Sequence, residues 1–142
     1  MKFFISFLFF LVFNVETFCQ ISFQKTYGTS NGESSSYIKQ TLDKGYISTG
    51  YTSYTSGESN MYLLKMDSVG GVSWSRNYNN PSWGPIGYNV SQTYDGGYII
   101  MGLTNLGVGL FKTDANGDSI WNKEFYSPSG IEGFSVHQTV DS

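Results

Sequence analysis

One eight-residue string occurs twice in this chain, and its recurrence constrains the fold more than any other feature of the sequence. Residues 40–47 read QTLDKGYI, and residues 92–99, which lie 52 positions later, read QTYDGGYI. The string starts a third time as QTVD at residues 138–141. Self-similarity at a fixed period of about 20–50 residues indicates a repeat architecture, in which each repeat is one supersecondary unit. We therefore expect units of about 50 residues rather than one irregular domain.

Each unit contains four short segments with strand character. The segments are rich in Tyr, Ile, Val and Thr, and the turns between them contain Gly, Asp and Asn, which favours strands over helices. The last segment alternates aromatic and polar residues, which indicates one buried face and one solvated face. We expect strands at residues 37–41, 46–52, 61–66 and 74–78 in the first unit and at 88–93, 98–104, 108–112 and 121–125 in the second.

Four strands per unit at this period are typical of the blades of a β-propeller. We predict an all-β fold, a β-propeller of four-stranded antiparallel blades, with blades at residues 37–78 and 88–125 and the start of a third at 134–142. Residues 21–27 repeat the pattern of a fourth strand, so we expect them to form an outer strand that closes the ring.

The predicted ring is larger than this chain. A ring of four to eight blades at about 50 residues each needs roughly 200 to 400 residues, whereas the chain has 142. We therefore expect an N-terminal fragment of a longer protein, whose total number of blades the repeats do not determine.

The N-terminal residues have the pattern of a secretory signal peptide. Lys2 precedes an apolar run of 11 residues at positions 3–13, interrupted by a single Ser, and a positive start before a short apolar core is typical of such signals. A membrane span needs about 20 apolar residues, so the run is too short to remain as an anchor. We expect cleavage after Cys19, which separates a signal at residues 1–19 from propeller repeats at 20–142.

Cleavage after Cys19 would remove the only cysteine, so the exported chain would hold no disulfide and its stability would rest on packing. The alternative is that Cys19 becomes a lipid-bearing first residue, but Thr17-Phe18 before it is a poor lipoprotein signal. We predict a secreted or cell-surface protein with no membrane span after signal cleavage.

The charge composition excludes a disordered chain and disfavours a nucleic-acid partner. Charged residues make up 13% of the chain and aromatic residues 18%, whereas disordered chains have high charge and few aromatics. Lys and Arg number 8 against 11 Asp and Glu, for a net charge of −3, which is the wrong balance for binding phosphate backbones.

Several Asp residues recur at equivalent positions of the units, which favours a structural role over a catalytic one. A catalytic constellation occurs once, whereas a group present in every unit serves the unit. An Asp side chain at a Gly-rich turn accepts hydrogen bonds from backbone N–H groups. We expect structural turn roles for Asp43, Asp95 and Asp141 after the first strand and for Asp67, Asp114 and Gly117 after the third.

No catalytic site, cofactor or metal is predicted. Asp114, Asn116 and Asp118 resemble the start of a calcium loop, but the twelfth position, which should be Glu, is Phe125. His137 is the only histidine, so no second imidazole can share a metal with it.

The single histidine occupies a repeated position. His137 aligns with Lys39 and Ser91 of the preceding units. Because this position accepts three different polar side chains, we expect it to face solvent or a central channel.

The segments that do not repeat are the expected place for a ligand, since binding residues are often carried by loops on a rigid scaffold. Trp83 is the one Trp outside the repeated pattern, and Tyr54 lies in the loop that is longer in the first unit. Exposed aromatic rings beside polar side chains suit stacking on a sugar ring, so both are candidate ligand contacts. The alternative for Trp83 is packing over the edge of a blade.

The second unit carries a longer pattern in full. It consists of Trp74-x-Arg76-x-Tyr78, the string at 92–99, Gly102-x-Thr104 and Lys112-x-Asp114-x-x-Gly117-x-x-x-Trp121. This pattern resembles the repeats of secreted β-propeller proteins of Bacteroidetes-type bacteria. The first unit departs from it at Lys44, where the pattern has Gly, and at Phe23, where it has Trp. The resemblance implies a propeller fold and export, and it implies no particular activity.

We therefore predict a secreted or cell-surface β-propeller module with a structural or interaction role, an unknown protein or glycan partner and no catalytic activity. The alternative is the N-terminal part of a secreted propeller enzyme or glycan-binding protein whose site lies in further blades.

Overall fold

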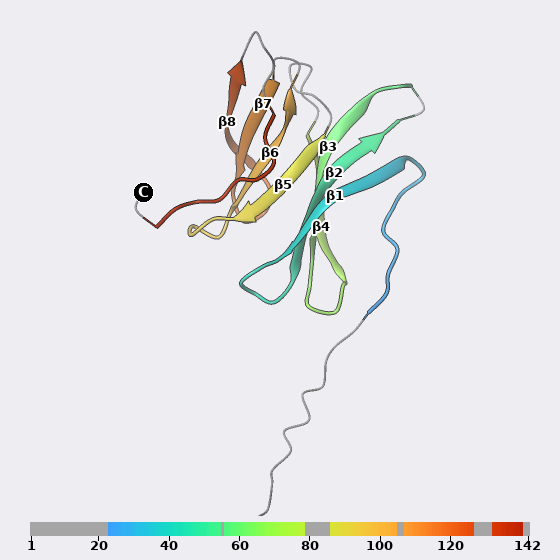
Figure 1. The fold of residues 1–142 in the computed structure, drawn as a ribbon. Coiled ribbons are helices and arrows are strands. Elements are labelled where there is room, and N and C mark those ends of the chain that lie inside the picture. Colours follow the sequence, from blue (N-terminus) through green and yellow to red (C-terminus); the bar gives the residue numbers. More distant parts are fainter. Residues whose placement is uncertain (1–22, 55, 79–85, 105–106, 127–131, 141–142) are drawn as a thin grey trace, which may run out of the picture.

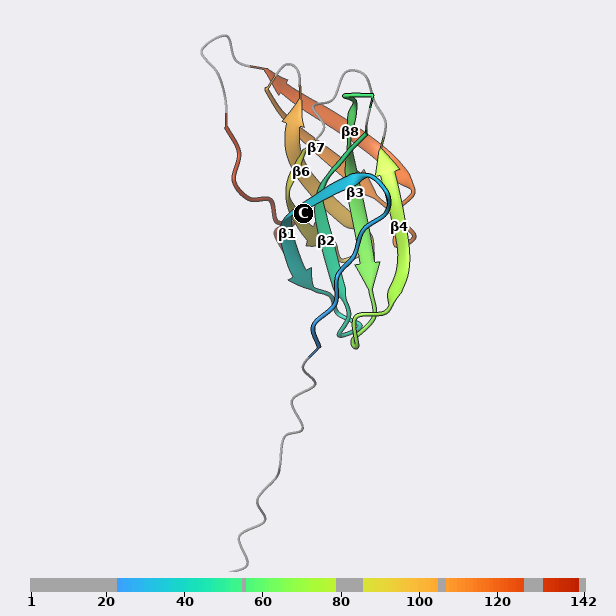
Figure 2. The same ribbon diagram turned by 90° about the vertical axis from the view of Figure 1, so that its right-hand side faces the viewer.

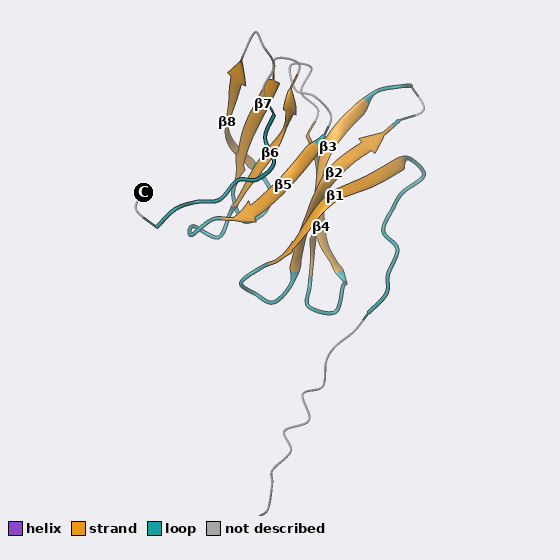
Figure 3. Ribbon diagram, viewed as in Figure 1, coloured by secondary structure: helices purple, strands orange, loops and turns teal. Residues whose placement is uncertain are grey.

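Eight strands form two four-stranded sheets in the part of the chain that the computed structural model describes, residues 23–54, 56–78, 86–104, 107–126 and 132–140. The first sheet contains β1 (Gly32–Gln40), β2 (Tyr46–Ser53), β3 (Ser59–Met66) and β4 (Val72–Tyr78). The second contains β5 (Gly87–Gln92), β6 (Tyr98–Thr104), β7 (Gly107–Thr113) and β8 (Ser119–Tyr126). Both sheets are antiparallel with strands in chain order, and the described residues contain no helix (Figures 1 and 3). The predicted all-β class is confirmed.

The largest difference from the expected strand boundaries is at the start of β1. This strand begins at Gly32 rather than at Tyr37. The added residues 32–36 read GESSS and carry no apolar alternation. A β-bulge between Ser35 and Tyr37 shifts the register, so no period-2 pattern runs through the whole strand.

Two segments that were expected to be strands form none. Residues 23–29 and 132–139 have no strand pairing, although strands were predicted at 21–27 and at the start of 134–142. A strand needs a neighbouring strand for its backbone hydrogen bonds, and no described segment pairs with either one. Both segments nevertheless lie against the sheets, and Figure 1 shows residues 132–140 running past β5 and β6.

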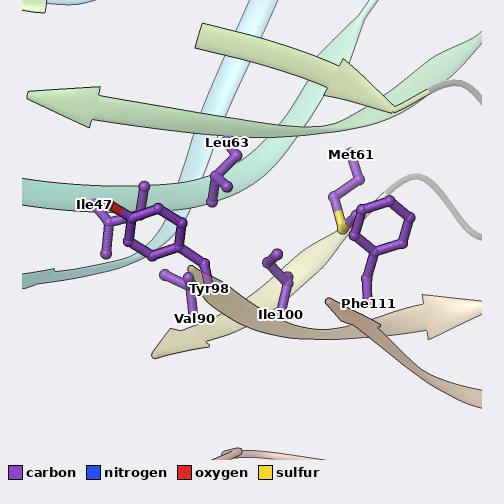
Figure 4. Close-up of a cluster of buried hydrophobic side chains, with 7 residues drawn as sticks. All are labelled: Ile47, Met61, Leu63, Val90, Tyr98, Ile100 and Phe111. Carbon is purple, nitrogen blue, oxygen red and sulfur yellow. The ribbon is translucent and has the colours of Figure 1, made fainter. Parts of the chain in front are cut away.

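The two sheets pack face to face, and the hydrophobic core lies between them. Figure 2 shows the strands of the first sheet in front of those of the second, and Figure 4 shows the core itself. Its buried side chains come from both sheets: Ile47, Met61 and Leu63 from the first and Val90, Tyr98, Ile100 and Phe111 from the second. Because side chains alternate along a strand, the face of each sheet away from this core is a separate surface.

Each outer face is partly covered by one end of the described chain. Residues 26–29 lie beside Thr52, Tyr62 and Leu64 on the outer face of the first sheet. On the outer face of the second sheet, a Cβ atom placed on Gly133 would lie 2.9 Å from the Met101 sulfur. The two sheets and the two end segments therefore form one continuous stack.

The turn after the first strand of each sheet requires a residue in the left-handed region. Gly96 has φ 81° in the second sheet, and Lys44 has φ 65° at the equivalent position of the first. A side chain at this position meets little else, since the nearest atom to a Cβ on Gly96 lies 4.0 Å away. Lys44, in place of the Gly found at position 96, therefore adds backbone strain but changes the packing little.

Replacing Lys44 with Gly is expected to raise the free energy of unfolding by about 0.5–1 kcal/mol. The relief of left-handed strain, roughly 1–2 kcal/mol, exceeds the entropy that Gly loses on folding, roughly 0.5–1 kcal/mol. Urea denaturation of Lys44→Gly measures the change, and the reciprocal Gly96→Lys variant should be destabilised by a similar amount. An unchanged or lowered stability of Lys44→Gly would contradict this account of the turn.

Candidate functional site

The turn after the first strand is organised by one Asp in each sheet. Asp95 Oδ1 accepts hydrogen bonds from the backbone N–H of Gly97 at 2.9 Å and from the hydroxyl of Thr93 at 2.6 Å. Asp43 makes the same two kinds of contact in the first sheet. Asp141, the third residue of this series, lies outside the described residues.

A buried lysine from the third strand completes each of these turns. Lys65 Nζ lies 2.7 Å from Asp43 Oδ2, and Lys112 Nζ lies 2.9 Å from Asp95 Oδ2. The two lysines are only 6% and 8% exposed, and each also donates to the carbonyl of the residue that follows it. The ion pair therefore ties β3 or β7 to the turn after the first strand of the same sheet.

These hydrogen bonds lower the pKa of both carboxyl groups. The hydrogen bond from Lys65, followed by that from Thr41, lowers the pKa of Asp43 from 3.8 to about 2. The hydrogen bonds from Thr93 and Lys112 lower the pKa of Asp95 to about 2 in the same way. Since each pKa is lower in the folded state, the ionised groups stabilise the fold at neutral pH. This contribution is lost as the pH falls from about 4 through about 2.

The turn between the third and fourth strands uses a second Asp. Asp114 Oδ1 accepts hydrogen bonds from the backbone N–H groups of Asn116 at 2.9 Å and Asp118 at 2.8 Å, and Asp67 makes equivalent contacts. Gly117 occupies the left-handed position of this turn with φ 80°. Asp114 Oδ1 is thus engaged by backbone donors of its own turn. Within the described ranges, no group of three or more His, Cys, Asp and Glu residues is placed to hold a metal.

An aromatic side chain of the fourth strand packs against the next sheet at a site that we call the aromatic seat. In the second sheet the aromatic seat consists of Tyr98 and Gly117. The Trp74 ring meets the Tyr98 ring edge-on with 5.8 Å between centroids, and the Tyr78 hydroxyl donates to the Gly117 carbonyl at 2.7 Å. A Cβ on Gly117 would lie 2.8 Å from the Trp74 ring, so a larger residue would displace the ring.

The aromatic seat of the first sheet, Tyr46 and Gly70, is occupied by the N-terminal segment. The Phe23 ring lies edge-on to the Tyr46 ring with 5.7 Å between centroids, and the Tyr27 hydroxyl donates to the Gly70 carbonyl at 2.8 Å. A Cβ on Gly70 would lie 2.5 Å from the Phe23 ring. Residues 23–27 therefore contact the first sheet as β4 contacts the second.

The outer face of the second sheet presents the same pair of aromatic positions to solvent. Trp121 and Phe125 on β8 correspond to Trp74 and Tyr78 on β4, and they are 44% and 37% exposed. A groove of about 430 Å³ on this side of the second sheet is lined largely by apolar side chains, among them Tyr88, Leu103, Val108 and Phe134. This face is thus an apolar surface that the described residues leave partly uncovered.

A glutamine of the first strand joins each unit to the one before it. Gln92 Oε1 accepts the backbone N–H of Leu42 at 2.9 Å, while its Nε2 donates to the carbonyl of Gly96 at 3.3 Å. Gln138 Oε1 likewise accepts the N–H of Tyr94 at 2.8 Å. The repeated Gln of the sequence pattern therefore holds the turn of the preceding unit by a hydrogen bond to its backbone. The spacing alone did not indicate this role.

The position that carries Lys, Ser and His in successive units forms a contiguous group that we call the polar row. Lys39 Nζ lies 3.1 Å from Ser91 Oγ, and Ser91 Oγ lies 3.3 Å from His137 Nδ1. Ser91 is 5% exposed, whereas Lys39 is half-buried and His137 is exposed. The alignment of the three residues was visible in the sequence. Their contact follows from the packing of the first strands.

The loop residues proposed as ligand contacts are not brought together by the described structure. Tyr54 accepts a hydrogen bond at 3.5 Å from the side-chain amide of Asn77, which places its hydroxyl against β4. Trp83 lies outside the described residues. The polar row is therefore a group of polar side chains from three successive units that the structure brings into contact.

Comparison with models of known families and with curated proteins found no match to this chain. Among the described residues, no helix is long and apolar enough to cross a membrane.

Asp95→Asn is expected to lower the free energy of unfolding at pH 7 by about 2 kcal/mol. The substitution leaves the Lys112 ammonium buried without a counter-charge, which destabilises the folded state. Solvent at the exposed Asp95 side of the ion pair screens the charges and limits the loss. The stability of the variant should also change less between pH 4 and pH 2 than that of the wild type, because the carboxyl group with the lowered pKa is gone.

The matched control is Asp118→Asn. The ion pair of Asp118 with Arg76 is exposed, with 3.4 Å between the charged atoms, and such pairs contribute about 0–1 kcal/mol. Urea denaturation of both variants makes the comparison. A loss for Asp95→Asn no larger than that for Asp118→Asn would show that the buried pair does not hold the turn.

Proposed function

We propose that the protein is a secreted or cell-surface β-propeller module with a structural or interaction role and no catalytic activity. The observation that carries this proposal is the aromatic seat, which is filled by residues 23–27 on the first sheet and by β4 on the second. The same contact is thus made twice by segments about 50 positions apart in the sequence.

The contact between sheets joins two different faces. The face of the first sheet that carries Trp74 and Tyr78 meets the face of the second that carries Tyr98 and Gly117. A contact between two different faces can be repeated from sheet to sheet. The sheets form a ring when the rotations between them add up to a full turn, and an open stack when they do not. A ring of four-stranded sheets is a β-propeller, and the exposed rings of β8 support the addition of a further sheet.

The two end segments support ring closure in particular. Residues 23–27 make the contacts of a fourth strand, and Gln138 makes the contact of a first strand. In a ring of four or more sheets, residues 23–27 would supply the fourth strand of the last sheet, and the segment of Gln138 would supply the first strand of the third. This arrangement accounts for the lack of strand pairing in the two segments, and it supports a closing role for residues 21–27.

The polar groups of the two sheets favour a structural or interaction role over catalysis. Asp43, Asp67, Asp95 and Asp114 each bind backbone donors of a turn at equivalent positions. Their carboxylates are thereby committed to holding the fold. Export is proposed from the signal pattern at residues 1–19 and from the resemblance of the repeats to those of secreted propeller proteins.

The proposal predicts that Trp74 and Trp121 contribute equally to the stability of the exported protein. Removal of a large buried aromatic side chain costs about 3–5 kcal/mol. If a further sheet covers β8, Trp121→Ala should destabilise the protein about as much as Trp74→Ala. Thermal unfolding of both variants, recovered from outside the cells that export them, measures the effect.

The control is Ile120→Ala, which removes an exposed apolar side chain at the β-bulge next to Trp121. It should change stability by less than about 1 kcal/mol. A similarly small effect of Trp121→Ala would mean that no sheet covers this face, and the propeller proposal would fail. Retention of all variants inside the cell would contradict the proposed export.

A further inference from the structure

We infer that the polar row of Lys39, Ser91 and His137 is a binding site for an oxyanion, such as the carboxylate, sulfate or phosphate group of a ligand. The inference rests on the proposed interaction role and adds the chemistry of what is bound. It goes beyond the sequence pattern, which predicted only that these positions face solvent or a channel.

The geometry of the polar row suits an acceptor with several oxygen atoms. The hydroxyl of Ser91 lies between the Lys39 ammonium at 3.1 Å and the His137 Nδ1 at 3.3 Å. A lysine ammonium is a donor only, and hydroxyl and imidazole groups can both donate. The Lys39 ammonium keeps two N–H donors beyond the one that it gives to Ser91. Because Ser91 and His137 share one hydrogen bond, either the Ser91 hydroxyl or the second ring nitrogen of His137 remains to donate to a bound oxyanion as well. Hydrogen bonds between ionised partners are about twice as strong as neutral ones.

The charge balance at the polar row differs from that around the other buried or half-buried cations. Lys65 and Lys112 are neutralised by Asp43 and Asp95. In the parts of the chain that the structure covers, no ion pair joins Lys39 to a carboxylate. A half-buried charge without a counter-ion is costly, so an anion beside Lys39 would remove that cost.

Two of the three side chains of the polar row reach solvent, since Lys39 is half-buried and His137 is exposed. β1 and β5 lie side by side where the two sheets meet (Figure 1), and His137 belongs to the segment that packs against the second sheet. The row uses none of the residues of the aromatic seats or of the Asp turns. In the proposed ring, successive first strands surround the central axis, so further units would add side chains at the same level.

The test is a titration of the ¹⁵N-labelled protein with sodium sulfate, sodium phosphate and sodium acetate, followed by NMR at constant ionic strength against sodium chloride. Saturable shifts of the Ser91 and His137 signals are expected with at least one of the three salts. Lys39→Gln should weaken the apparent affinity about tenfold or more, and His137→Gln should weaken it to a smaller extent. A stronger response to acetate than to sulfate would identify a carboxylate ligand, and the reverse order would identify a sulfate or phosphate group.

The matched control is Lys123→Gln, which removes an exposed lysine that lies over the Phe125 ring at 5.4 Å and outside the polar row. This variant should bind like the wild type. The inference is overturned if no salt gives a saturable shift, if Lys39→Gln binds as well as the wild type, or if Lys123→Gln loses binding to the same extent as Lys39→Gln.

A second measurement separates failure of this inference from failure of the proposed function. Nuclear Overhauser effects between the Lys39 and Ser91 side chains report directly on the packing of β1 against β5. If they are present and no anion binds, the binding site is disproved while the stacked sheets remain. If they are absent, the packing that supports both proposals is wrong.

Discussion

The structure depends on the contact between an aromatic side chain of one sheet and the aromatic seat of the next. Trp74 reaches Tyr98 only because Gly117 presents no side chain, and Tyr78 then meets the Gly117 carbonyl directly. Burial raises the pKa of the Tyr78 hydroxyl well above its ordinary value, so the group stays neutral and donates. An edge-on aromatic pair adds about 0.5–1.5 kcal/mol to the burial of its rings. This contact determines how far apart the sheets lie and which faces meet.

The polar contacts inside each unit hold its turns in the conformation in which one sheet stacks on the next. The Lys112–Asp95 pair and its counterpart in the first sheet hold the turn after the first strand. Gln92 then reaches from the next unit to Leu42 in that turn. A backbone donor of this turn is therefore paired with a side chain of the next unit. The polar row takes part in neither the Asp turns nor the Gln contacts.

Much of the local structure was predictable from the sequence, because strands and turns are encoded by nearby residues. The alternation of Trp74, Arg76 and Tyr78 predicted the fourth strand. Contacts between residues distant in the sequence were less accessible, since the partner of Lys65 lies 22 positions away and no spacing rule indicates it. A strand was also predicted at residues 21–27, whereas residues 23–27 pair with no strand in the described structure. Alternation identifies a buried face but supplies no neighbouring strand. The same alternation predicts that β8 has an apolar face. It does not predict how exposed that face is, because exposure depends on which segment covers it.

The central claim is that the sheets are held together by the aromatic seat, and the coupling between Trp74 and Tyr98 tests it most directly. The measurement is a double-mutant cycle with Trp74→Leu, Tyr98→Leu and the double variant, each unfolded by urea. We predict a coupling free energy of about 1 kcal/mol. If the two losses of stability were additive to within about 0.3 kcal/mol, the rings would not interact across the sheets, and the account would be contradicted.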